Sequence, residues 1–426
     1  MGGSNKDEIR LIECLEKFRE LSKGEGNFNE QLKVTENVIK YLLKLLTPSQ
    51  LQFSPIGEKL ASYVKKIWGY LKKTQKRALG IAEFRRDNII HSFRVFLLGC
   101  YILYSLYNER GDYITKCFKE DLKLICECLS DDFKRKIFGT FSEDEIIKQY
   151  IEKIEFKNIL WMWLLSALFH DIGKPIEDAV EEIIRLMNIY NIESIDIDSL
   201  VFSIAEDLKV NSNKVKEFMK IYSNGQIRQF LRNRTGSEKK WDHGVLSATM
   251  LYSPLTEGIS RRDSFSIGDR DSFSIGDWSH YLPLYPPFIA IMLHTEPSKY
   301  IFCTSLTQLL IICDELQEWN RITAIGDKEV MIFPCKSLHL ELENREMRVL
   351  IPYERPIDVI SQEIFRRFDP KRRWREIAKG NPICRNNDLL FQKVTVRVLL
   401  DQTGKICTIE IHPNGINYSI SHPFLY

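Results

Sequence analysis

The chain has 426 residues, 44% of them hydrophobic, so it can enclose a substantial core and is neither a disordered nor a fibrous protein. Its 60 Lys and Arg residues are balanced by 58 Asp and Glu residues, which leaves a formal net charge of +2. So balanced a chain has no overall attraction for nucleic acid or for an anionic membrane surface, and any anion-binding site must be local.

Ten cysteines are scattered along the chain without a Cys-x-x-Cys pair, and several lie in apolar stretches. This pattern is typical of reduced core thiols in a cytoplasmic protein. No secretory signal opens the chain, and its longest apolar run, near residues 158–169, is too short to cross a bilayer. We therefore expect a cytoplasmic protein without a membrane-spanning segment.

The helical patterns come first along the chain. Apolar residues recur at three- and four-residue intervals over 9–22 and 38–46, which predicts an N-terminal helical segment over residues 1–80. A long helix-rich region follows over 81–325. Its clearest predicted helices are DNIIHSFRVFLLGCYILYSLY, the apolar run before His170, and SLTQLLIICDELQEWNR.

After residue 326 the apolar period changes from 3.6 to 2, which indicates strands. Leu338, Leu340 and Leu342 alternate with polar residues before a turn at 344–345. Alternating valines from Val394 to Val398 and a DQTGK turn predict a second hairpin, and IDVISQEIFRRF predicts a helix between the two. Residues 326–426 are thus expected to form a small α+β domain, and the whole chain a mainly α fold.

One internal repeat stands out, because RDSFSIGD occurs at 262–269 and again, unchanged, at 270–277. Eight residues repeated once are too few for a solenoid unit. Surface loops tolerate such insertions because the entropy of loop closure grows slowly with length. We interpret the repeat as a tandem duplication in a surface loop.

The strongest chemical signal is His170-Asp171, which follows the apolar helix predicted over 161–169. A carboxylate at the end of a buried helix is costly to desolvate unless a cation compensates its charge, and a metal ion would do so. Gly173 and Pro175 then end the helix and leave Lys174 at its mouth.

Four further residues have the same chemistry in apolar surroundings. Asp314 lies within a predicted apolar helix, and His91 lies near the start of another. His243 opens a helix after Asp242, which can cap that helix or orient the imidazole, and His294 ends the apolar run FIAIML. Imidazole and carboxylate donors together suit Mn, Fe, Ni or Zn better than Ca.

The order His, His-Asp, His, His, Asp resembles the HD superfamily of metal-dependent phosphohydrolases, with HDIGKP at 170–175 as its most specific part. The resemblance covers about 81–325 and implies a helical HD-type domain. It implies that one ion is held by His91, His170, Asp171 and Asp314. Asp171 would bridge to a second ion, held by His243 and His294, and a metal-bridged hydroxide would attack a phosphoester while Lys174 binds a phosphate oxygen.

The chain departs from the family in two ways. Long intervals separate the motifs, and His280 is the substitute for His243 as a ligand. The subfamily that cleaves cyclic di-GMP carries His-His-Glu and Gly-Tyr-Pro signatures, whereas residues 293–296 here read Leu-His-Thr-Glu, so that substrate is not supported.

We therefore expect a phosphohydrolase, a phosphodiesterase or nucleotidase with two divalent transition-metal ions and a nucleotide or other phosphorylated small molecule as substrate. Two alternatives stay open: a di-iron oxygenase of the HD type, and a non-catalytic sensor stabilised by its metal. The basic and aromatic run at 365–380 could bind nucleic acid, but the sequence favours a solvated surface there.

Overall fold

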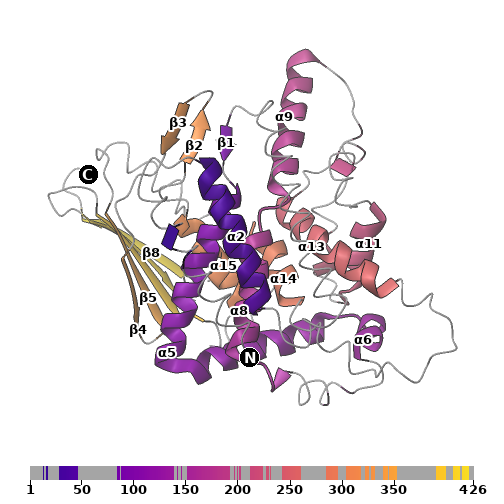
Figure 1. Cartoon of the computed structure of the whole chain (residues 1–426), viewed down its shortest axis with the longest axis horizontal. Coiled ribbons are helices and arrows are strands. Elements are labelled where there is room, and N and C mark those ends of the chain that lie inside the picture. Colours follow the sequence, from indigo (N-terminus) through magenta and orange to yellow (C-terminus); the bar gives the residue numbers. More distant parts are fainter. Residues whose placement is uncertain are drawn as a thin grey trace.

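The computed structural model describes residues 13, 16–17, 28–46, 84–86, 88–138, 142, 145, 151–191, 196, 199, 201–202, 212–223, 227–229, 231, 242–260, 285–295, 304–317, 322–325, 328–331, 339–343, 345–352, 390–399, 406–412 and 415–421. Figure 1 shows a body of helices with a twisted sheet at one side and a smaller sheet above it. This arrangement confirms the predicted mainly α fold with a small α+β part.

Nine helices have defined ends in the described part of the chain. They are α2 (Phe28–Leu46), α5 (Asn88–Cys128), α6 (Asp131–Phe138), α8 (Phe156–Phe169), α9 (Lys174–Tyr190), α11 (Ser212–Lys220), α13 (His243–Ser260), α14 (Tyr285–Leu293) and α15 (Ser305–Gln317). The helix expected over 38–46 is present as part of α2, and the helix expected before His170 is α8.

Helix α8 lies at the centre of the helical body, where it contacts α5, α14 and α15. It is apolar on all sides, as expected of a core helix, and Trp161 and Trp163 are both fully buried. The indole Nε1 of Trp163 donates to the carbonyl of Phe96 at 2.9 Å. Gly99 faces the same indole, and a Cβ at that position would overlap it, so α5 and α8 pack closely because residue 99 is glycine.

Helix α5 consists of two helical segments that meet at a kink at Arg110, whose φ is −152° and ψ is 54°. By length and composition alone, its residues Ile90–Cys128 would suffice to cross a membrane, which the sequence analysis did not expect. Buried helices of soluble proteins meet the same criteria, and most of this apolar window is buried inside the protein. The feature is therefore weak evidence for a membrane span.

A three-stranded antiparallel sheet connects the segment before α5 with the segment after α15. Its strands are β1 (Phe84–Arg86), β2 (Ile322–Ile325) and β3 (Lys328–Met331), in that order. Strand β1 precedes α5 and β2 follows α15, so their pairing brings the start of α5 near the end of α15. Those two helices carry His91 and Asp314, respectively.

The second sheet has five strands in the order β4-β5-β6-β7-β8. Their bounds are β4 (His339–Glu343), β5 (Glu346–Pro352), β6 (Lys393–Leu399), β7 (Ile406–His412) and β8 (Gly415–Ser421). Both predicted hairpins are confirmed, since β4 pairs antiparallel with β5 and β6 with β7. Strands β5 and β6 are parallel, which requires a crossover connection between them.

The sheet is attached to the helical body through Gln308 of α15. The side-chain amide of Gln308 donates to the carbonyl of Phe391 at 2.9 Å and accepts from the backbone N–H of Phe391 at 2.9 Å. Phe391 is itself buried in the shared core. Arg345 adds a cation–π contact, with its guanidinium 4.7 Å from the ring centroid of Tyr113 on α5.

Several sequence expectations lie wholly or mainly outside the residues that the structure describes. They are the helix over 9–22, the RDSFSIGD repeat at 262–277, His280, the helix over 357–368, and the basic and aromatic run at 365–380. The division at residues 80 and 325 stays a prediction.

Candidate metal centre

Five separate elements bring the six predicted ligands together. His91 comes from the first turn of α5, His170 and Asp171 from the turn after α8, His243 from the start of α13, His294 from the end of α14, and Asp314 from α15. The four helices α5, α8, α14 and α15 contact one another, and α13 packs on α14. The packing of this helical core therefore carries the site.

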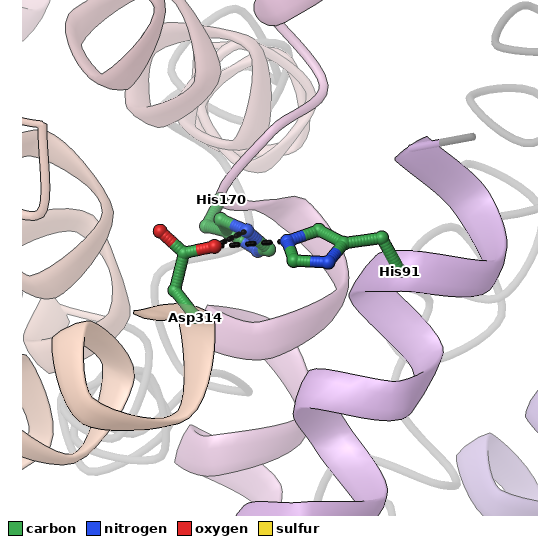
Figure 2. Close-up of side chains that lie close together, drawn as sticks. All are labelled: His91, His170 and Asp314. Carbon is green, nitrogen blue, oxygen red and sulfur yellow. Dashed lines mark hydrogen bonds and ion pairs between the residues drawn. The ribbon is translucent and has the colours of Figure 1, made fainter. Parts of the chain in front are cut away.

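One group of donors consists of His91, His170 and Asp314 (Figure 2). Nε2 of His91 lies 2.8 Å from Oδ1 of Asp314, and Nε2 of His170 lies 3.6 Å from the same oxygen. Both histidines are buried, with 2% and 0% of their surface exposed. Two imidazoles thus face one carboxylate oxygen in the interior of the protein.

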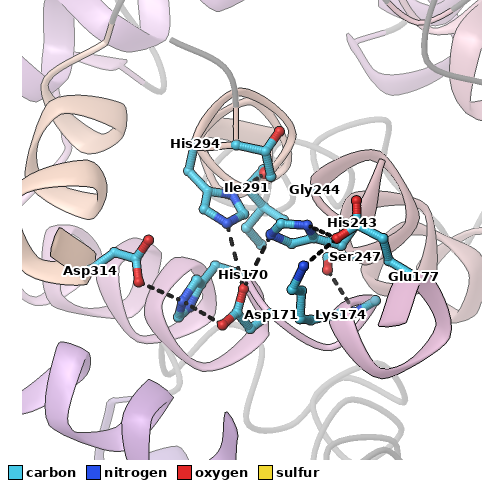
Figure 3. Close-up of polar contacts among 12 residues, drawn as sticks. His170, Asp171, Lys174, Glu177, His243, Gly244, Ser247, Ile291, His294 and Asp314 are labelled. Atoms are coloured by element: carbon cyan, nitrogen blue, oxygen red, sulfur yellow. Dashed lines mark hydrogen bonds and ion pairs between the residues drawn. The ribbon is translucent and has the colours of Figure 1, made fainter. Parts of the chain in front are cut away.

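Asp171 lies between this group and a second pair of histidines, and its two oxygens face different partners. Oδ2 is 3.5 Å from Nε2 of His170 and 4.0 Å from Nε2 of His91. Oδ1 is 3.4 Å from Nε2 of His243 and 3.7 Å from Nε2 of His294. Figure 3 shows Asp171 between His170 on one side and His243 and His294 on the other. One carboxylate therefore contacts both halves of the cluster.

Backbone carbonyls determine which nitrogen of two histidines faces the site. Nδ1 of His170 lies 2.8 Å from the carbonyl of Ala167, and Nδ1 of His294 lies 2.6 Å from the carbonyl of Ile291. Because a carbonyl oxygen only accepts hydrogen bonds, both Nδ1 atoms carry the proton. When either ring is neutral its lone pair is therefore on Nε2, which faces the carboxylates, as a metal ligand requires.

His243 is oriented by a carboxylate that the sequence analysis did not identify. Its Nδ1 lies 2.8 Å from Oε2 of Glu177 on α9, and Glu177 also accepts from Nζ of Lys174 at 2.5 Å. Glu177 is 5% exposed, and these two partners stabilise its buried negative charge. A sequence signal was available, because Pro175 is favoured in the first turn of a helix and residues three apart in a helix, such as Lys174 and Glu177, share one face.

Charges of opposite sign dominate the electrostatics of the cluster. Burial by itself would raise the pKa of Asp171, but His170 and His243 hold that pKa well below its ordinary value. Burial likewise opposes ionisation of Asp314, whose pKa His170 and His91 also keep well below the ordinary value. Both carboxylates are therefore ionised at neutral pH, as metal ligands must be.

The pKa values of His243 and His294 are shifted in opposite directions. Burial lowers the pKa of His243, but the carboxylates of Glu177 and Asp171 outweigh burial and raise that pKa to about 10. Burial also lowers the pKa of His294, and positive charge on His170 lowers it further. His170, whose pKa the carboxylates of Asp171 and Asp314 raise against burial, and His243 therefore carry the positive charge that offsets these carboxylates, and a bound metal ion would replace their protons.

The donors fit a metal ion on geometric grounds. Nε2 of His170 and Nε2 of His294 are buried and hydrogen-bond to nothing among the residues described, although carboxylate oxygens lie 3.5–3.7 Å away. Two ligands that each lie about 2.1 Å from one ion are separated by about 3.0–3.4 Å, close to these spacings. The buried His–Asp cluster can therefore hold a metal ion.

Two glycines allow α13 to approach the site closely. A Cβ on Gly173 would lie 2.6 Å from the carbonyl oxygen of His243 and 2.8 Å from Cβ of Leu246. The backbone N–H of Gly173 instead donates to Oγ of Ser247 at 2.8 Å. A Cβ on Gly244 would lie 2.7 Å from the carbonyl oxygen of Ile291 on α14. These contacts place His243 beside Asp171.

Lys174 lies at the edge of the cluster, with 28% of its side chain exposed. Besides Glu177 it pairs with Asp178, at 3.2 Å. Its expected role in phosphate binding stays a prediction. His280, the substitute considered for His243, lies outside the described residues, whereas His243 itself lies in the cluster.

Comparison of the whole chain with protein-family models, with curated proteins and with solved structures finds no match.

Proposed function

We propose that this chain is a metal-dependent phosphohydrolase of the HD type, which cleaves phosphoester bonds in a nucleotide or a similar phosphorylated small molecule. The observation that carries the proposal is the position of Asp171. Its Oδ2 faces His91 and His170, and its Oδ1 faces His243 and His294, at 3.4–4.0 Å. A carboxylate with this placement can bridge two ions.

In this proposal each half of the cluster holds one ion. The first ion would be held by His91, His170, Asp171 and Asp314, and the second by Asp171, His243 and His294. Two divalent ions, when bound, activate water as a nucleophile near neutral pH and neutralise charge on a phosphoryl group during in-line displacement. The mixture of imidazole and carboxylate donors suits Mn, Fe, Ni or Zn.

The chain's own residues would prepare the site. Glu177 accepts the Nδ1 proton of His243 and so keeps Nε2 of that ring directed at Asp171. Lys174 would bind a non-bridging phosphate oxygen of the substrate and offset the charge that develops in the transition state. To do so it would exchange its contact with exposed Asp178 for the phosphate.

The test is hydrolysis by protein reconstituted separately with Mn²⁺, Fe²⁺, Ni²⁺ or Zn²⁺. The substrate panel should contain mononucleotides, linear dinucleotides, cyclic nucleotides and bis(p-nitrophenyl) phosphate. Activity that requires the metal and disappears in Asp171→Ala supports the proposal. Absence of phosphoester cleavage with every metal would contradict it.

The same donor set could also hold two irons, so a di-iron oxygenase is the second candidate. The reconstituted Fe²⁺ protein distinguishes the two functions when it is assayed with and without oxygen. Oxygen consumption with an organic co-substrate and without phosphate release would favour the oxygenase.

A further inference from the structure

Two polar residues flank the pair of histidines that face Oδ1 of Asp171. Asp242 immediately precedes His243 at the start of α13, and Thr295 immediately follows His294 at the end of α14. Neither residue belongs to the proposed ligand set. Asp242 is nevertheless buried, with 4% of its surface exposed, so its charge depends on nearby donors.

The carboxylate of Asp242 joins the two helix ends. Oδ1 accepts from the backbone N–H groups of Gly244 at 2.9 Å and Val245 at 3.2 Å, which is the bonding of a helix N-cap. The hydroxyl of Thr295 lies 2.9 Å from Oδ1 and 2.8 Å from Oδ2. One side chain therefore caps α13 and at the same time binds Thr295, two residues beyond the last residue of α14.

Close packing reinforces this connection. A Cβ on Gly244 would lie 2.8 Å from Cγ2 of Thr295 and 2.7 Å from the carbonyl oxygen of Ile291. That same carbonyl accepts the Nδ1 proton of His294. The contact between the two helix ends thus includes the group that orients one of the two imidazoles.

The result is a fixed relation between the two rings. The ring centroids of His243 and His294 are 5.2 Å apart with an interplanar angle of 73°, and both Nε2 atoms face Oδ1 of Asp171. A metal site requires its ligands to be held within a few tenths of an ångström, which two independent helix ends would not ensure.

We propose that Asp242 and Thr295 are positioning residues for the second metal ion. Their hydrogen bond, named here the 242–295 latch, holds the helix ends that carry His243 and His294 at the spacing one ion requires. This inference rests on the two-ion centre proposed above. It extends that proposal, because it assigns a role in metal affinity to two residues outside the ligand set.

The competing explanation is that Asp242 serves only as a helix cap. The two explanations separate in Asp242→Ser, because serine is as good an N-cap as aspartate but has no counterpart of Oδ2, which accepts from Thr295 at 2.8 Å. They also separate in Thr295→Val, which removes the hydroxyl and keeps a methyl group over Gly244. Thr295→Ser keeps the hydroxyl and is the conservative variant.

The experiment is titration of chelator-treated full-length protein with Co²⁺, followed by calorimetry and by visible absorption of the bound ion. In the wild type we expect two binding steps. In Asp242→Ser and in Thr295→Val we expect the second step to weaken by about 10-fold or more, as for other residues that orient metal ligands. The first step should be unchanged, and Thr295→Ser should bind like the wild type.

A matched control is Thr249→Val, since the hydroxyl of buried Thr249 donates within α13, to the carbonyl of Val245 at 2.9 Å, and to no other residue that the structure describes. It should leave both steps unchanged. The double variant Asp242→Ser/Thr295→Val should be no weaker than either single variant, because both remove the same interaction. Circular dichroism and the temperature of unfolding show whether each variant remains folded.

Wild-type affinity for both ions in Asp242→Ser and Thr295→Val would overturn the inference, as would equal weakening of both steps. Such a result would leave the proposed hydrolase untouched. If the wild type takes up two Co²⁺ ions and cleaves no phosphoester, the proposed function fails, while the latch is still judged by the titration. Uptake of fewer than two ions by the wild type would overturn the two-ion centre and the latch together.

Discussion

Nε2 of His91 lies 2.8 Å from Oδ1 of Asp314, although 223 positions of sequence separate them. The contact exists because α5 and α15 pack against each other and because β1 and β2 pair at their ends. It connects two ionisable groups in the protein interior, where an ion between them would replace a proton as the shared positive charge.

Metal ions should therefore stabilise the fold. Adding Mn²⁺ or Co²⁺ to chelator-treated protein should raise the temperature of unfolding, because the ions bind the folded chain and offset repulsion between Asp171 and Asp314. At a free concentration 100 times the Kd, one ion adds about 3 kcal/mol to the free energy of unfolding. Differential scanning fluorimetry measures the shift. Ca²⁺, which prefers oxygen ligands, is the control, and an equal shift with Ca²⁺ would contradict the assignment of imidazole ligands.

Asp171→Ala should abolish phosphoester hydrolysis more completely than any other single substitution, because Asp171 contacts both halves of the cluster. Lys174→Ala should keep both ions and lose roughly 10²–10³ in kcat, the size typical of one lost transition-state donor. Asp178→Ala, which removes only the exposed partner of Lys174, is the control. The measurements are metal content by elemental analysis and kcat. Wild-type turnover in Asp171→Ala would refute the assignment of Asp171 as the bridging ligand.

Glu177→Ala should weaken the second ion by about 10–100-fold, since His243 would lose the acceptor that orients its ring. Glu177→Gln keeps an acceptor oxygen at the same distance and should lose much less. Calorimetric titration with Co²⁺ gives both affinities. Equal losses in the two variants would show that the charge of Glu177 matters more than its hydrogen bond to His243.

Gly173→Ala should destabilise the protein by about 1–3 kcal/mol, because the added Cβ meets the backbone of His243 rather than a mobile side chain. It should also weaken the second ion by moving His243 away from Asp171. Gly111→Ala is the control, since its Cβ would meet only the ring of half-exposed Tyr107. Urea unfolding compares the two, and equal stability in both variants would argue against close packing at Gly173.

Asp121 lies away from the proposed metal ligands. It should make the free energy of unfolding depend on pH. It is buried on α5 and accepts from the N–H groups of Ser305 and Leu306 at the start of α15. Burial outweighs these hydrogen bonds and raises the pKa of Asp121 to about 7. In the unfolded chain Asp121 releases its proton at lower pH, so its contribution to stability falls as pH rises from about 4 to about 7.

Asp121→Asn should remove that contribution, because asparagine keeps one acceptor and does not titrate. The difference in free energy of unfolding between Asp121→Asn and the wild type should therefore grow between about pH 4 and pH 7 and then level off. Urea unfolding at several pH values measures it. A constant difference across this range would show that Asp121 does not titrate there.

Local sequence was sufficient for part of this molecule. The alternation of apolar residues predicted the hairpin of β6 and β7, because strand side chains alternate between the two faces of a sheet, and in the structure Val396 pairs with Ile409. The same reasoning predicted that His170 and Asp171 follow a buried helix. Each of these features depends on residues that are neighbours along the chain.

The tertiary structure alone decided which residues of one helix meet the ligands and supporting residues of another. Glu177 contacts His243 across 66 positions, and Thr295 contacts Asp242 across 53. Apolar periodicity records which face of a helix is buried, but not which residue of another helix meets it. The orientation of the imidazoles therefore depends on the packing of α9, α13 and α14, since only that packing brings their polar side chains within hydrogen-bonding distance.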